Sequence, residues 1–254
     1  HLWGTNGLVL ELEVALAPAH PWLESLVVFD GFDDALRFAD ALAHAPGIVK
    51  REVAFLASPV PDHLAQLAEH LPKGCHAVLS LVAESSEAPM LELVDAHGGK
   101  PSYRKTAEEV RKSNRTLMEF TWNHTTLHAL KVDKSLTYLQ SSFVPGQHVQ
   151  QITEMEQLFA GEVMMHAEFL RNLDGLITCS ALQLVRFTTE ERLDEIIRMH
   201  RERGVRINNP HVFIVEDGKA GGALPQEIIE MKRRFDPKGL LNPGKLRDWP
   251  VSKA

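Results

Sequence analysis

Residues 115–147, RTLMEFTWNHTTLHALKVDKSLTYLQSSFVPGQ, are richer in Trp, Asn, His and Thr than a segment that only fills a core. Within it, His124 carries an imidazole, which at neutral pH can accept the proton of an alcohol. Trp122, Tyr138 and Phe143 carry ring surfaces that are suited to contact a substrate. We therefore predict His124 as a candidate catalytic base and the three aromatic residues as substrate contacts.

A second histidine, His128, follows His124 by four residues, so a helix would place both on one face. Zinc proteases use this spacing in the motif HExxH, but Thr125 occupies the position of the required Glu. The sequence therefore does not favour zinc proteolysis. We expect His124 to face the substrate and His128 to pack or to form a hydrogen bond.

Another pair of chemically able residues lies in HAEFLRNLDGLITCSAL, where His166 and Glu168 are two positions apart. In a strand this spacing puts both side chains on the same face of the sheet. Arg171 and Arg186 flank the pair of strands in this region and could supply a site for an anion, although we expect a surface ion pair for each of them.

Both ends of the chain contain residues that favour turns. Gly4, Thr5 and Gly7 form a glycine-rich turn, whose missing side chains would allow the backbone to approach a cofactor closely. A simple hairpin turn explains the same residues. Asn242 lies in LLNPGK, where an Asn-Pro turn is as good an interpretation on local grounds, and Lys245 follows as a surface residue.

The composition limits the class of protein. With 254 residues and 44% hydrophobic side chains the chain can fill a core, and its net charge of -7 gives no reason to expect nucleic acid as a partner. The apolar runs are too short and too charged to span a membrane. Two cysteines, Cys75 and Cys179, form no disulfide pattern, which predicts a cytoplasmic protein.

The elements that must position these residues follow from periodicity. Residues 8–16 alternate apolar and acidic side chains, as in a half-buried strand. Strands and short helices then alternate, and Leu36, Ala39 and Leu42 share one helix face. This order predicts an α+β fold, a ferredoxin-like antiparallel sheet with helices.

The pattern is then repeated. We predict a helix at 147–159, strands at 162–171 and 175–187, and a helix at 189–203 that opens with Thr188 and Glu191 in a capping box. The sheet is therefore expected to be built twice. A last helix begins at Pro225 and directs Ile228, Ile229 and Phe235 inward.

Two terminal motifs carry a family resemblance. GTNGLVLELEVALAP, residues 4–18, resembles the GTxGIITxxxLxL segment that closes the FAD-binding domain of the vanillyl-alcohol oxidase and p-cresol methylhydroxylase superfamily. FDPKGLLNPGKL, residues 235–246, resembles the DPxxILNPGK signature near the C-terminus of that superfamily. The resemblance implies that residues 1–20 end an FAD-binding domain and contribute its last strand. It also implies that 21–225 form a substrate cap domain and that 226–254 return to the FAD domain.

By the same resemblance, Gly4, Thr5, Gly7 and Asn242 would contact FAD. The glycolate oxidase and D-lactate dehydrogenase branch carries HxGDGNxH, whose histidines hold a metal. Here His166 and Glu168 remain as possible metal ligands and are our substrate-binding and catalytic candidates, but the GDGN turn and the second histidine are missing. The sequence therefore favours no metal.

Two further motifs of that branch have changed. Its W-x-x-R helix start grips a substrate carboxylate through the Arg, and if Trp122 aligns, Thr125 stands at that position. Its EHGIG motif supplies a catalytic His, for which His211 in NNPHVFIVEDG is the nearest match. His211 is then the second candidate base, and a structural role for this loop histidine is the alternative.

The sequence thus predicts the C-terminal, substrate-binding part of an FAD-dependent oxidoreductase, inactive as a fragment. It would oxidise an alcohol or 2-hydroxy acid by hydride transfer to flavin N5. Its partners would be the small-molecule substrate, the upstream FAD-binding domain and an acceptor: oxygen, a cytochrome or an electron-transfer flavoprotein. A non-catalytic ferredoxin-like module that binds small molecules or regulates is the alternative, because fold does not fix function.

Overall fold

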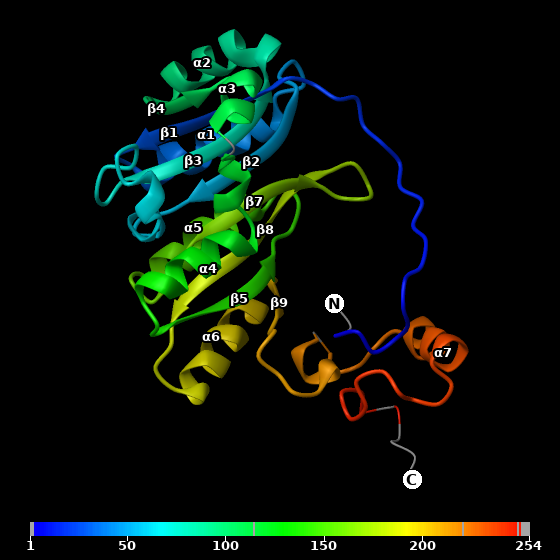
Figure 1. Ribbon diagram of the computed structural model, residues 1–254. Coiled ribbons are helices and arrows are strands. Elements are labelled where there is room, and N and C mark those ends of the chain that lie inside the picture. Colours follow the sequence, from blue (N-terminus) through cyan, green and yellow to red (C-terminus); the bar gives the residue numbers. More distant parts are fainter. Residues whose placement is uncertain (1–2, 114, 220, 248, 250–254) are drawn as a thin grey trace. The chain divides into compact units, whose positions relative to one another are not determined.

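The structure is a computed structural model that describes residues 3–113, 115–219, 221–247 and 249. The chain forms two compact units. One is continuous and comprises residues 19–206, and the other combines residues 1–18 with 207–254. The larger unit contains almost all of the regular secondary structure (Figure 1).

The first half of the larger unit is a ferredoxin-like layer. Its sheet order is β4-β1-β3-β2, and every neighbouring pair is antiparallel. A βαββαβ chain path gives this order because each helix carries the chain past one strand. The elements are β1 (Trp22–Phe29), α1 (Phe32–His44), β2 (Lys50–Leu56), β3 (His76–Ala83), α2 (Glu87–Ala96) and β4 (Lys100–Lys105).

The second half repeats this path in the order β7-β8-β5-β9, and the short strand β6 (Val163–Met164) pairs with β8. The two layers join edge to edge where β2 pairs antiparallel with β7, so that one sheet is built twice, as predicted. Its elements are α4 (Asn123–Val132), β5 (Leu136–Ser142), α5 (His148–Leu158), β7 (His166–Arg171), β8 (Ile177–Arg186), α6 (Glu190–Glu202) and β9 (Arg206–Asn208).

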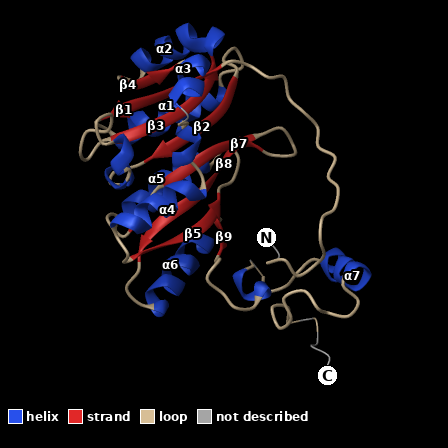
Figure 2. Cartoon of the chain, viewed as in Figure 1, coloured by secondary structure: helices blue, strands red, loops and turns tan. Residues whose placement is uncertain are grey.

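Helices cover both faces of the sheet near the junction of the two halves (Figure 2). Helix α1 packs on β2, β3 and β7 and contacts α2 and α5 on the same side. The short helix η4 (Leu117–Phe120) and α4 cover the other face, where Phe120 and Ala129 join a core that includes Ala54 and Leu56. We refer to these two sides as the α1 face and the α4 face.

The remaining helices and turns are short. They are η1 (Val60–His63), η2 (Ala65–Leu67), η3 (Glu84–Ser86), α3 (Ala107–Ser113), η5 (Val215–Gly218) and α7 (Gln226–Phe235). The predicted inward face of α1 is confirmed, since Leu36, Ala39 and Leu42 are fully buried.

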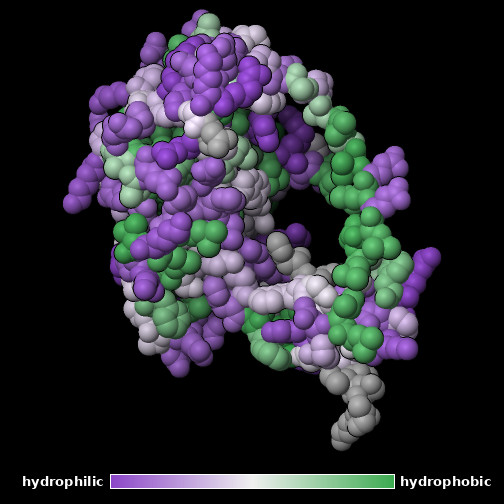
Figure 3. Space-filling view, in the orientation of Figure 1, coloured by the Kyte–Doolittle hydropathy of each residue, from purple (hydrophilic) through white to green (hydrophobic). Residues whose placement is uncertain are grey.

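Three local predictions were wrong. Residues 8–16 form no strand, because among the described residues none provides the hydrogen-bonding partner that a strand needs. Their apolar side chains are exposed, as the green atoms of this extended segment show (Figure 3). Helix α6 is capped by Thr189, whose side chain accepts from the Arg192 backbone, and not by Thr188. Phe235 is exposed in α7, while Ile229 is buried.

Candidate functional site

The sheet opens beside the point where its two halves meet. Strands β2 and β7 pair over Ala54–Leu56 and His166–Glu168. Just before this stretch, the register of β2 against β3 shifts between Lys50 and Glu52. Such a bulge interrupts the alternation of side chains along a strand. As a result Lys50 pairs with Val82 and Glu52 with Leu81, so the two side chains point to opposite faces.

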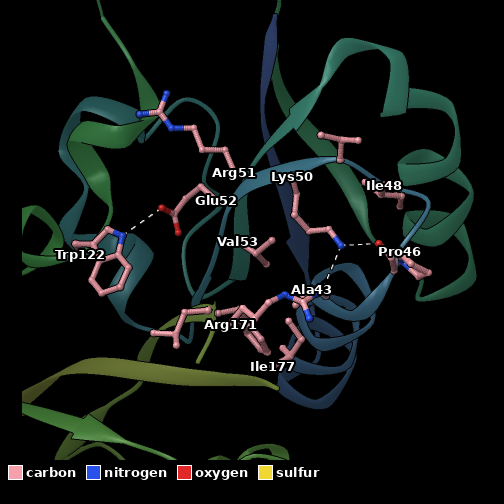
Figure 4. Close-up of a pocket in the computed structure, with 14 residues that line it drawn as sticks. Ala43, Pro46, Ile48, Lys50, Arg51, Glu52, Val53, Trp122, Arg171 and Ile177 are labelled. Carbon is pink, nitrogen blue, oxygen red and sulfur yellow. Dashed lines mark hydrogen bonds between the residues drawn. The ribbon is translucent and has the colours of Figure 1, made fainter. Parts of the chain in front are cut away.

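A pocket of about 520 Å³ lies at this opening (Figure 4). This volume lies within the range of small-molecule sites. The lining comes from the end of α1 and the loop after it, from β2, from the start of α4, and from β7 and β8. The residues that contribute are Ala43, Ala45, Pro46, Ile48, Val49, Lys50, Arg51, Glu52, Val53, Trp122, Phe169, Leu170, Arg171 and Ile177.

A buried cluster of three titratable side chains lies on the α4 face: Glu52, which also lines the pocket, His166 and Glu168. Glu52 is 7% exposed, and the other two are fully buried. His166 Nε2 lies 2.7 Å from Glu168 Oε1, and the carboxyl groups of Glu52 and Glu168 are close enough to interact. The cluster joins both halves of the sheet, since Glu52 comes from β2 and the other two residues from β7.

Burial changes the protonation of all three groups, because a charged group loses its hydration there. Burial and the neighbouring Glu168 carboxyl raise the pKa of Glu52 to about 8. Burial raises the pKa of Glu168 to about 7, and it lowers the pKa of His166 to about 4. Near neutral pH the imidazole is therefore uncharged, and the pair of carboxyl groups retains at least one proton.

Trp122 closes this cluster at the start of α4. Its backbone N–H donates to Glu168 Oε1 at 2.6 Å, and its indole Nε1–H donates to Glu52 Oε2 at 3.1 Å. Its φ is 52°, in the left-handed region that is costly for a bulky side chain. A strained aromatic residue that binds two buried carboxyl groups is a feature typical of functional sites.

Thr125 takes the place at which the resemblance would have an Arg. It is fully buried, and its hydroxyl donates to the Phe120 carbonyl at 2.5 Å. The hydroxyl also lies 3.4 Å from His166 Nε2. A neutral hydroxyl side chain therefore lies beside the cluster.

The structure brings together three of the predicted site residues of the larger unit: Trp122, His166 and Glu168. His124 lies on the exposed surface of α4, and its backbone N–H donates to the Thr121 carbonyl. Tyr138 is half-buried in β5 opposite Leu184, and Phe143 is buried just after that strand. Glu52 was missed, although a single acidic residue in the apolar strand REVAFLA is a signal for it.

In the smaller unit the two terminal motifs pack against each other. Gly4 has φ +68°, and a Cβ atom there would lie 3.3 Å from the Asn242 side-chain nitrogen. That amide donates to the carbonyl of Trp3. Lys232 Nζ donates to the Thr5 carbonyl and to the Asp236 carboxylate, at 2.7 Å each. Residues more than 200 positions apart thus form one turn region.

The other predicted residues of this unit have local partners. The Thr5 side chain is fully buried and its hydroxyl donates to Asn6 Oδ1 at 2.6 Å. A Cβ atom at Gly7 would lie 3.2 Å from Phe235 Cβ. His211 is exposed, and its backbone N–H donates to Asn209 Oδ1.

No group of three or more His, Cys, Asp or Glu side chains in the described ranges has an arrangement that could hold a metal ion. Within the same ranges, every helix is too short or too polar to cross a membrane.

The fold of this chain is similar to that of solved structures. Two crystal structures of alkyldihydroxyacetonephosphate synthase match over 89% of this chain, with TM-scores of 0.50 and 0.51 and 10% sequence identity. The fold is shared with that synthase. The match covers 45% of the synthase chain, so this chain spans under half of its length. No protein-family model and no curated protein matches the sequence.

Proposed function

We propose that this chain is the C-terminal, substrate-binding part of an FAD-dependent oxidoreductase that oxidises an alcohol or a 2-hydroxy acid. The observation that carries the proposal is the packing of the two terminal motifs on each other, through Gly4 and Asn242. Both motifs resemble flavoprotein signatures of the vanillyl-alcohol oxidase superfamily. The antiparallel sheet that lies between them in the sequence has the fold expected of a cap domain in that superfamily.

The residues at the turn of the terminal motifs fit a bound FAD. Gly4 and Gly7 both have positive φ. Gly4 is exposed and has no side chain that would keep a ring system away from the backbone, whereas Phe235 fills the space beside Gly7. Asn242 is exposed at φ +41°. The hydroxyl of Thr5 already has a partner, so this residue would contribute through its backbone. FAD bound there would accept the hydride of the substrate.

The chain's own residues would bind the substrate and handle its proton. The imidazole of His211 or of His124, both exposed, would accept the hydroxyl proton. Trp122 would contact the substrate at the pocket. Tyr138 and Phe143 do not line this pocket and remain predicted contacts from the sequence alone. Glu168, with a pKa of about 7, can release and take up a proton near neutral pH, and His166 holds its carboxyl group in place.

The first experiment compares this chain with the product of its complete gene, each purified with added FAD. We expect a yellow complete protein whose flavin absorbance is bleached, without oxygen, by a member of a panel of alcohols and 2-hydroxy acids. A colourless complete protein would overturn the proposal and favour the non-catalytic ferredoxin-like module.

A matched pair of variants tests the role of Glu168. The substitution Glu168→Gln keeps the shape and the acceptor for the Trp122 backbone but removes the exchangeable proton. Loss of a general acid or base slows a reaction by about 10²-fold or more. We expect flavin bleaching to slow by that factor and its pH profile to lose the inflection near 7, whereas Glu92→Gln on the exposed side of α2 leaves both unchanged. An unchanged pH profile in Glu168→Gln would contradict this role.

A further inference from the structure

The α1 side of the pocket carries two cationic side chains that face each other. The bulge in β2 directs Lys50 to the α1 face, together with Val53, which lies three residues further along. Arg171 shares that face from the end of β7, where it pairs with Ile177. In the close-up the side chains of Lys50 and Arg171 approach one another, while Arg51 points away from both (Figure 4).

Among the described residues, neither cation has a carboxylate partner. Lys50 Nζ donates to the carbonyls of Ala43 and Ala45, at 3.0 and 2.6 Å, and Arg171 donates to the Gly175 carbonyl at 2.6 Å. An ammonium has three donors and a guanidinium five, so both groups retain donors for a ligand. The ion pairs formed within the described ranges involve other cations.

The acid that lines the pocket does not neutralise this pair. Glu52 points to the α4 face and accepts the indole N–H of Trp122. With a pKa of about 8 it is protonated at neutral pH. Burial and the charge of Arg171 lower the pKa of Lys50, so the two cations repel each other in the absence of an anion.

The rest of this wall is apolar. Val53, Phe169 and Ile48 are buried side chains that line the pocket next to the cations, and Ile177 is half-buried beside Arg171. A guanidinium fork and an ammonium recognise the oxygens of a carboxylate or a phosphate, and the apolar wall suits a small organic body.

We propose that the α1 side of this pocket is a binding site for a small organic anion, in which Lys50 and Arg171 hold a carboxylate or phosphate and the apolar wall holds its body. This site lies on the opposite face of the sheet from the cluster of Glu52, His166 and Glu168. Its ligand can be measured without any turnover, so failure of this site and failure of the flavin chemistry proposed above can be told apart.

Isothermal titration calorimetry on the protein tests the proposal with three probes: phenylacetate, phenyl phosphate and the uncharged 2-phenylethanol. We expect one of the two anions to bind at about 1 mM or below and the alcohol to bind about tenfold more weakly or not at all. The tighter anion identifies the head group. Affinity should fall when the salt concentration rises, because charged contacts near the surface are screened.

Two substitutions of equal charge locate the site. Arg171→Gln should weaken binding of the anion about tenfold or more, since a hydrogen bond to a charged group contributes of that order. Arg51→Gln is the matched control and should change affinity less than about threefold. Lys50→Met should also weaken binding, but Lys50 binds the carbonyls at the end of α1, so thermal unfolding must show that the variant folds.

Three results would overturn the proposal. The first is that neither anion binds at about 1 mM, and the second is that 2-phenylethanol binds as tightly as the anions. The third is that Arg51→Gln weakens binding as much as Arg171→Gln. A protein that binds the anion but has no flavin activity in its complete form would refute the proposed function and leave the anion site in place.

Discussion

Replacing Glu52 by Gln tests whether the buried cluster holds protons in the folded protein. In the fold the pKa of Glu52 is about 8, whereas its ordinary value is 4.5. Between these values the folded protein binds one proton that the unfolded chain has released. Stability therefore falls as the pH rises through this window, by about 1.4 kcal/mol per pH unit for this carboxyl group.

The other two groups of the cluster act with opposite signs. Glu168, with a pKa raised to about 7, also lowers stability as the pH rises from 4.5 toward 7. His166, with a pKa lowered from 6.5 to about 4, raises stability between those two values, since there the unfolded chain holds the extra proton. Both proteins contain Glu168 and His166, and Glu52 interacts with both groups. The difference between Glu52→Gln and the parent therefore reports the titration of Glu52 together with the change that its removal makes in the pKa values of these two neighbours.

We expect the free energy of unfolding of Glu52→Gln, relative to the parent, to increase by about 2 kcal/mol between about pH 5 and about pH 6.5. The amide introduced by this substitution keeps an oxygen that accepts the Trp122 indole N–H, so the hydrogen bond is preserved while the titration is lost. Urea unfolding followed by tryptophan fluorescence measures the difference at each pH.

The control is Glu92→Gln, which removes an exposed carboxyl group from α2. Its effect on stability should be small, because this side chain is hydrated in both states. A difference between Glu52→Gln and the parent that stays constant across the window would refute the argument, since it would mean that Glu52 is ionised in the folded protein.

Two further changes test the packing and capping of the larger unit. In Gly99→Ala the new Cβ atom would lie 2.6 Å from Val27 Cγ1, and such overpacking costs about 1–3 kcal/mol. Gly47→Ala meets nothing within 4 Å, so equal midpoints of urea unfolding for the two variants would contradict this estimate. Thr189→Ala should cost about 1 kcal/mol by loss of the cap of α6. Thr188→Ala should destabilise the protein much less. If thermal unfolding showed a larger loss for Thr188→Ala than for Thr189→Ala, then Thr188 would be the N-cap of α6, as the sequence predicts.

The doubled sheet could be predicted because each of its strands and helices is marked by the pattern of side chains within its own segment of the sequence. Alternation with a period of two marks the strands, and the helical period marks the buried face of α1 through Leu36, Ala39 and Leu42. The spacing of His166 and Glu168 also sufficed to place them on one face. The predicted bounds of α5, β8 and α6 differ from those observed by at most two residues at each end, since their turns carry clear breakers.

What could not be predicted depends on contacts between distant residues. The bulge that turns Lys50 and Glu52 to opposite faces is visible only in the pairing of β2 with β3. The alternation of residues 8–16 indicates a strand, but a strand needs a partner to supply its hydrogen bonds. The observed N-cap of α6 differs from the predicted one by a single residue for another reason. Both Thr188 and Thr189 have a hydroxyl that can cap a helix, so the sequence alone does not decide between them.

Trp122 shows why the candidate site lies where the two halves of the sheet meet. A left-handed backbone at a tryptophan persists only where surrounding contacts outweigh its cost. Here the backbone N–H binds Glu168 of β7 and the indole binds Glu52 of β2, so one residue ties α4 to both halves. Because β2 and β7 pair over Ala54–Leu56 and then separate, the same junction leaves room for a pocket beside these bonds. The substitution Trp122→Gly would relieve the backbone strain, because glycine adopts a positive φ at little cost. It would also remove the indole N–H that donates to Glu52, so the loss of this hydrogen bond opposes the gain in backbone energy.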